Sequence, residues 1–127
     1  MGPHLRRMKS YKPRRRRGKN LEVSKQALRD LEHRMTREVN TLILLWEEGN
    51  VKEIESAKLK AKSGYLKHGN EMQKVAQNLG ERYTRAVRDF LDSVDTILHS
   101  DSTWVDEAKI RRCYQMTQNL EKEITAA

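Results

Sequence analysis

The chain has 127 residues and a formal net charge of +8, with 35% of its residues charged, 36% hydrophobic and 6% aromatic. This length fits one domain with a tail, and the charge-rich composition with only two prolines favours helices over a β-sandwich or barrel. The single cysteine excludes an internal disulfide and a cysteine-based metal site within one chain.

No membrane-spanning or secretory segment is expected. The longest apolar run, residues 42–46, is far shorter than the roughly 20 residues that cross a bilayer. The N-terminus is basic but has no apolar core behind it, unlike a secretory signal. We therefore expect an intracellular or particle-bound protein without a membrane partner.

The first 20 residues form a basic arm with nine lysines and arginines and no acidic residue. Because the whole chain has 26 basic and 18 acidic residues, residues 21–127 hold 17 basic and 18 acidic ones, so the entire positive excess lies in the arm. Pro13, Gly18 and four consecutive arginines that repel one another predict an arm that is extended or disordered on its own. The basic residues are Arg6, Arg7, Lys9, Lys12, Arg14, Arg15, Arg16, Arg17 and Lys19.

A helix is predicted to follow the arm from Leu21. Its apolar residues recur at spacings of three, four or seven, with one interruption at Glu38. Gly49 predicts the end of this helix, and Asn50 with Glu53 predicts a capping box at the start of the next. The stripe consists of Leu21, Leu28, Leu31, Met35, Leu42 and Leu45.

The second helical region begins at Val51 and weakens where Gly64 and Gly69 occur. These glycines predict a break, kink or loop between residues 63 and 70. From Met72 to Ile97 the helical period is the strongest in the chain, which predicts one continuous helix with Gly80 inside it, at a close helix crossing or a bend. The stripe is wide, so this helix is expected to face more than one neighbour.

The segment 99–109 predicts the start of a last helix. Asp101, Ser102 or Thr103 is the expected N-cap, and Thr103 with Asp106 resembles a capping box. A thin apolar stripe follows to the end of the chain. Its members are Ile110, Cys113, Thr117, Leu120 and Ile124.

These segments predict an all-α protein with two parts. Residues 21–127 are expected to form a three- to four-helix antiparallel bundle, preceded by the extended basic arm of residues 1–20. Because the apolar content is low, the bundle is expected to be marginally stable alone and to form homo- or hetero-oligomers through its helical stripes.

The arm is the main candidate binding site. Lysines and arginines on backbone phosphates release counterions, which gives salt-dependent affinity without sequence preference, and the arginine fork matches phosphate oxygens. Other interpretations stay open: a nuclear localisation signal, a mitochondrial presequence, contact with an acidic partner or membrane surface, or a solvated tail. Lys58 and Lys62 share a helical face and could extend the phosphate-binding track, although lysines near glycines are more often a solvated face.

Catalysis has no support in the residue pattern. The histidines lack metal-binding spacing, and Cys113 lies in a helical stripe where a core thiol is usual. Asp89, Asp92 and Asp95 rotate around a helix and lack the glycine turn of a calcium loop. We therefore predict a protein that is not an enzyme, with no catalytic site, metal site, cofactor or small-molecule substrate.

The arm "RRMKSYKPRRRRGK" on a charge-balanced helical body resembles the organisation of nucleocapsid-type proteins. More narrowly, it is similar to the small helical coat proteins of filamentous archaeal viruses that wrap double-stranded DNA. That resemblance implies a genome held in A form between helices of paired subunits.

The resulting expectation is a structural protein that packages nucleic acid without sequence readout, in a virion or an intracellular nucleoprotein particle, with duplex DNA favoured over RNA. One alternative is an RNA-binding subunit of a ribosome or other ribonucleoprotein. Another is a nuclear helical adaptor whose arm is only an import signal.

Overall fold

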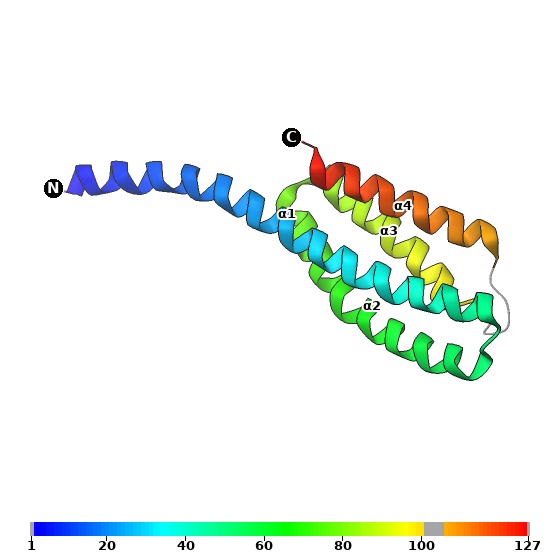
Figure 1. The fold of residues 1–127 in the computed structure, drawn as a ribbon. Coiled ribbons are helices and arrows are strands. Elements are labelled where there is room, and N and C mark those ends of the chain that lie inside the picture. The colour runs from blue at the N-terminus through cyan, green and yellow to red at the C-terminus, as the bar shows by residue number, and fades with distance from the viewer. Residues whose placement is uncertain (1, 101–105, 127) are drawn as a thin grey trace.

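The computed structural model describes the backbone of residues 2–100 and 106–126, and the side chains of residues 21–100 and 106–126. It contains four helices, α1 (Gly2–Glu48), α2 (Val51–Leu79), α3 (Glu81–Leu98) and α4 (Glu107–Thr125), and the described residues include no strand. The helices alternate in direction and form a bundle (Figure 1). The predicted all-helical class and helical bundle are confirmed.

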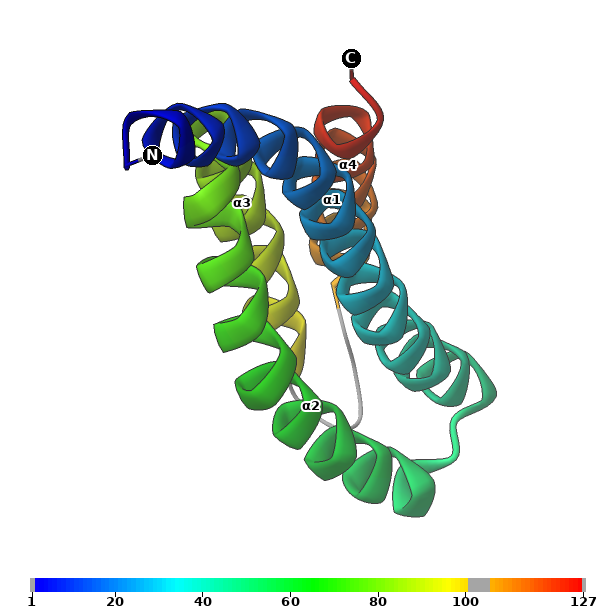
Figure 2. The same ribbon diagram turned by 90° about the vertical axis from the view of Figure 1, so that its left-hand side faces the viewer.

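The bundle consists of two antiparallel pairs. In Figure 2, α1 and α2 lie in front, with α3 behind α2 and α4 behind α1. Each helix packs against its neighbours in the chain, and α1 also contacts α4, although less extensively. Among the described residues, no helix is both apolar and long enough to cross a membrane.

The core is built from apolar side chains of all four helices. Phe90 and Leu42 are fully buried, as are Met72 and Leu120, and burial of a large apolar side chain contributes roughly 1.5–3 kcal/mol. The wide stripe of α3 faces α2 and α4 of the same chain, so its neighbours are intramolecular. The buried apolar residues of α3 are Val87, Phe90, Leu91, Val94, Ile97 and Leu98.

The end of α1 is at the predicted position. Gly49 has a left-handed φ of 72°, its N–H donates to the carbonyl of Trp46 at 3.1 Å, and the N–H of Asn50 donates to that of Leu45 at 3.1 Å. These two bonds form a Schellman motif. The capping box predicted beside it is wrong, because the side chain of Asn50 makes no capping hydrogen bond.

The predicted break between residues 63 and 70 is also wrong, since α2 continues through both glycines. Each glycine lies where α2 closely approaches another helix. A Cβ at Gly64 would lie 2.5 Å from Oε2 of Glu38 in α1, and one at Gly69 would lie 3.4 Å from Cδ2 of Leu91 in α3. Close packing, rather than a turn, therefore accounts for the absence of side chains here.

The chain turns at Gly80 instead. Its φ is 131°, a conformation that favours glycine, and it ends α2 and begins α3. The continuous helix predicted from Met72 to Ile97 is therefore wrong, because this segment belongs to two antiparallel helices. Gly69 and Leu91, on opposite sides of the turn, meet between them.

The N-terminus of α4 differs from its predicted cap. Asp101, Ser102 and Thr103 lie outside the described residues, and the N-cap is Asp106, whose carboxylate accepts a hydrogen bond from the N–H of Ala108 at 3.0 Å. Asp106 therefore occupies the capping position itself rather than the third position of a box that begins at Thr103.

The backbone of the arm is helical from Gly2 onward, whereas an extended or disordered arm was expected. Two effects favour the helix. Arginine and lysine have high intrinsic helix propensity, and the arm continues a helix whose nucleation cost is already met by packing of the following residues. This part of α1 projects beyond the bundle (Figure 1).

Candidate functional site

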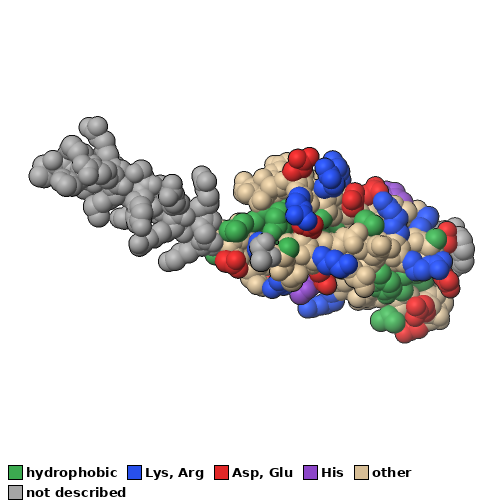
Figure 3. All heavy atoms as spheres, turned by 90° about the horizontal axis from the view of Figure 1, so that it is seen from above, with side chains coloured by type: hydrophobic (Ala, Val, Ile, Leu, Met, Phe, Trp, Pro, Cys, Tyr) green, Lys and Arg blue, Asp and Glu red, His purple; other side chains and the backbone are tan. Residues whose placement is uncertain are grey.

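The nine basic residues of the arm, Arg6 to Lys19, all belong to the part of α1 that extends beyond the other helices (Figure 1). The surface of the bundle has a different character. On the face shown in Figure 3, basic and acidic side chains of the described residues are interspersed. The structure therefore separates the charged arm from the charge-balanced body.

The base of the arm is fixed to the bundle where α1 meets α3 and α4. Nζ of Lys25 donates to the carbonyl of Ala126 at 3.0 Å and lies 6.0 Å from the centroid of the Tyr83 ring. Nearby, the guanidinium of Arg82 pairs with Glu123 at 3.2 Å. The contacts of Lys25 link the first turns after the arm to α3 and α4.

The structure does not bring Lys58 and Lys62 to the arm. Nζ of Lys58 donates a hydrogen bond to the carbonyl of Ser100, just after α3, and Lys62 is half-buried. Gly64 of the same helix faces Glu38, which lies roughly 27 Å along α1 from the end of the arm. Ser100 follows the C-terminal end of α3, where a positive charge is favoured by the helix dipole.

Several arginines that follow Gly80 form ion pairs on the surface of the bundle. Arg85 pairs with Glu81 at 3.4 Å and Arg112 with Asp92 at 3.3 Å. Asp95 instead faces His99, with Nδ1 of the imidazole 3.2 Å from its carboxylate. Asp92 and Asp95 thus have separate partners.

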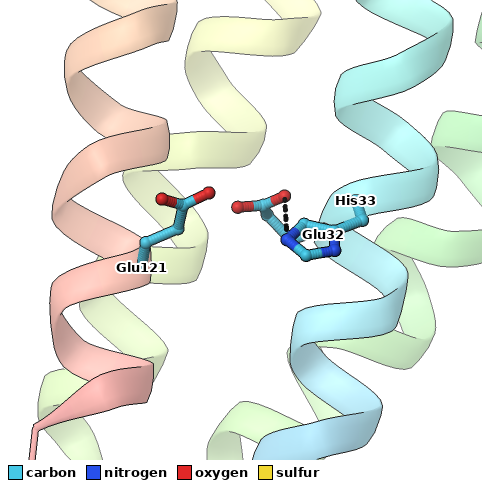
Figure 4. A group of neighbouring side chains, drawn as sticks. All are labelled: Glu32, His33 and Glu121. Carbon is cyan, nitrogen blue, oxygen red and sulfur yellow. Dashed lines mark ion pairs between the residues drawn. The ribbon is translucent and has the colours of Figure 1, made fainter.

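A site that the sequence analysis missed lies between α1 and α4 (Figure 4). Glu32 is fully buried, and its Oε2 accepts a hydrogen bond from Oγ1 of Thr36 at 3.3 Å. Its other oxygen, Oε1, is buried and has no hydrogen-bond partner. The imidazole Nε2 of His33 lies 3.9 Å from Oε2, and the carboxylate of Glu121 faces Glu32 from α4. One ligand atom from each of Glu32, His33 and Glu121 lies within 4.8 Å of the others.

The surroundings of Glu32 raise its pKa to about 8. Burial is the main cause, because it disfavours the ionised form, and the adjacent Glu121 carboxylate raises the pKa further. The hydroxyl of Thr36 and the charge of Arg29 oppose this rise in pKa. At neutral pH the Glu32 carboxyl of the metal-free protein is therefore mostly protonated.

One signal for this site is present in the sequence. Glu32 follows Leu28 by four residues and precedes Met35 by three, so it occupies a core position of the apolar stripe. An acidic residue at such a position predicts a buried carboxyl that needs a partner. The partner could not be identified from local spacing, because Glu121 is on another helix.

The lone thiol is a core residue, as predicted. Cys113 is 5% exposed, and burial raises its pKa, although hydrogen bonds from Ser93 and Thr117 and the charge of Arg112 act in the opposite direction. A buried thiol with a raised pKa has little thiolate at neutral pH and is a poor nucleophile.

Comparisons of the chain with protein-family models, curated proteins and solved structures found no match. Two features of the chain are candidate binding sites: the basic arm, and the separate group formed by Glu32, His33 and Glu121.

Proposed function

We propose that the chain is a structural nucleic-acid-binding protein of the packaging type. Its arm neutralises backbone phosphates without reading bases, and its bundle assembles with neighbouring subunits. The observation that carries this proposal is the charge distribution: the arm has nine basic and no acidic residues, whereas residues 21–127 have 17 basic and 18 acidic ones. A ligand with a dense negative charge is the natural complement of such an arm.

The linear charge density of the arm supports a duplex as that ligand. Arg6 and Lys19 are roughly 20 Å apart along a helix that rises about 1.5 Å per residue. Duplex DNA carries roughly 12 phosphate charges over that length, which is comparable with the nine basic residues of the arm. Contacts of this kind position a protein on the backbone and carry no sequence information.

The helical backbone of the arm favours DNA over RNA. At about 100° per residue, its nine basic positions are spread around the helix axis rather than along one side. A helix of this kind suits a groove with phosphates on both walls. The major groove of B-form DNA admits an α-helix, whereas that of A-form RNA is too deep and narrow.

The assembly part of the proposal rests on the outer face of α2. Leu59 and Leu66 are seven residues apart on one side of that helix and are 68% and 67% exposed. An apolar strip of this kind, next to a charge-balanced surface, can pack against a second subunit. Repeated along a nucleic acid, such contacts would produce a virion or another nucleoprotein particle.

The test is a salt titration of binding to generic duplex DNA and duplex RNA, measured by fluorescence anisotropy. The variant replaces Arg14, Arg15, Arg16 and Arg17 with Gln in the full chain. If all four contact phosphates, the slope of log affinity against log salt becomes shallower by about 3 to 4. A matched control removes the same charge from exposed positions of the bundle: Arg37, Lys60, Lys67 and Lys74 to Gln.

The expected result is a large loss of affinity in the arm variant and little change in the control. Equal effects of the two variants, or no binding by the wild type at low salt, would overturn the proposal. Tighter binding to RNA than to DNA would instead favour the ribonucleoprotein alternative. Nuclear import that depends on the arm, in a protein that does not bind nucleic acid, would favour the adaptor.

A further inference from the structure

We propose that Glu32, His33 and Glu121 form a binding site for a divalent transition-metal ion of the Zn²⁺ class at the contact between α1 and α4. The site is separate from the arm, and the inference does not depend on nucleic-acid binding. It rests on the donor set, on the geometry and on one buried oxygen without a partner.

The donor set suits such an ion. One imidazole nitrogen and two carboxylate oxygens are the borderline and hard ligands that Zn²⁺, Co²⁺ or Ni²⁺ accept in proteins. Three protein ligands leave a position for water, as in other open sites. Two carboxylates facing one another also attract a cation, because each disfavours the charge of the other.

The geometry places the three groups close to a common centre. Ligand distances of about 2.0–2.2 Å require the donor atoms to lie roughly 3.3–3.6 Å apart in a tetrahedral arrangement. His33 Nε2 and Glu32 Oε2 are 3.9 Å apart, and all three donor atoms lie within 4.8 Å of one another. His33 is 54% exposed and Glu121 is also exposed, so both side chains can move inward by about 1 Å through rotation about their side-chain torsions.

The buried oxygen is the second, independent observation. Oε1 of Glu32 has no hydrogen-bond partner, in a side chain with no exposed surface, and its carboxyl group points between His33 and Glu121 (Figure 4). Leaving a buried polar atom without a partner costs roughly 1–3 kcal/mol. A bound cation would satisfy this oxygen and would compensate both carboxylates at once.

Metal binding here would join the first and last helices. Glu32 and His33 belong to α1 and Glu121 to α4, and these two helices are in contact less extensively than the other adjacent pairs. An ion bound only by the folded chain stabilises it according to its concentration and affinity. The site therefore stabilises the helix pair from which the arm emerges.

The test uses untagged, metal-free full-length protein without nucleic acid. Titration with Zn²⁺ by calorimetry, and with Co²⁺ followed by its visible absorption, gives the stoichiometry and the ligand field. The expected result is one ion per chain and a rise in unfolding temperature with Zn²⁺. The exposed variants His33→Asn and Glu121→Gln are expected to weaken Zn²⁺ binding at least tenfold each while leaving the metal-free protein folded.

His99→Asn is the matched control. It removes another exposed histidine beside a carboxylate, Asp95 at 3.2 Å, outside the proposed site, so Zn²⁺ binding is expected to be unchanged. Three results would overturn the proposal. They are no binding of either ion, binding that survives both His33→Asn and Glu121→Gln, or binding that His99→Asn removes.

Discussion

The two parts of α1 have opposite relations to the rest of the chain. Residues 21–48 place six apolar side chains in the core, and their stability comes from contacts with other helices. Residues 2–20 continue the same helix beyond the bundle (Figure 1) and hold the whole positive excess of the protein. One helix therefore has a packed structural part at one end and, at the other, a projecting basic part, which is the part proposed to bind nucleic acid.

The largest expected effect tests whether stability belongs to the bundle alone. Phe90 is fully buried, and Phe90→Ala is expected to lower the free energy of unfolding by about 3–5 kcal/mol, because it removes apolar contacts and leaves a cavity. Urea unfolding followed by circular dichroism measures the change. In the same assay, the variant with Arg14 to Arg17 replaced by Gln is expected to match the wild type to within about 0.5 kcal/mol. A comparable loss of unfolding free energy in the arm variant would contradict the view that the arm contributes little to stability.

The next effect concerns the pH dependence of bundle stability. The folded-state pKa of Glu32 is raised from 4.5 to about 8, chiefly by burial, so the folded protein holds this proton more tightly than the unfolded chain. Stability from this group is fully present below pH 4.5 and is lost as pH rises toward 8, by roughly 1.4 kcal/mol per pH unit at most. The groups near its carboxyl are Arg29, His33 and Thr36 of α1 and Glu121 and Cys113 of α4.

Glu32→Gln isolates this contribution, because the amide has the same shape and does not titrate. The measurement uses metal-free buffer with a chelator. Between about pH 6 and pH 8 the free energy of unfolding of the wild type is expected to fall by about 2 kcal/mol relative to that of the variant. Urea unfolding across that range measures the difference. An identical pH dependence of the two proteins would show that Glu32 is ionised in the folded state.

The features that were predictable from the sequence depend on near neighbours in the chain. The stripe from Leu28 to Leu42 and the end of α1 at Gly49 follow from helical spacing and from the backbone freedom of glycine. The glycines of α2 show the limit. Gly69 and Gly80 look alike in the sequence, but one lies against Leu91 and the other forms a turn.

The candidate sites show the same division. The charge of the arm is evident from composition alone, whereas its helical backbone depends on continuity with the packed part of α1. The site at Glu32 needs Glu121, which only the tertiary contact between α1 and α4 brings near (Figure 4). Local patterns predict elements and charge, but they do not determine which distant side chains meet.

A third prediction uses the contrast between the two glycines. Gly80→Ala is expected to destabilise the bundle by roughly 1–2 kcal/mol, since φ is 131° there and a side chain strains that conformation. Gly69→Ala places a Cβ at an ordinary distance of 3.4 Å from Leu91 and gains helix propensity, so its effect is expected to be neutral or stabilising by up to about 1 kcal/mol. Thermal unfolding of both variants measures the difference. A Gly69→Ala variant less stable than Gly80→Ala would contradict the assignment of Gly80 to a turn and Gly69 to a close helix crossing.

The smallest effect tests whether a local change in the bundle leaves the arm unaffected. Asp106→Ala removes the carboxylate that accepts from the N–H of Ala108 and is expected to cost about 1 kcal/mol of unfolding free energy. Asp106→Asn retains a capping oxygen and should recover most of that loss, which separates the cap from a change of charge. Because Asp106 is in the bundle and makes no part of the arm, the salt dependence of nucleic-acid binding should be the same in both variants as in the wild type. A shallower slope of log affinity against log salt in Asp106→Ala alone would mean that binding by the arm depends on how α4 is anchored, through contacts such as that of Lys25 with Ala126. The two parts of α1 would then act as one unit.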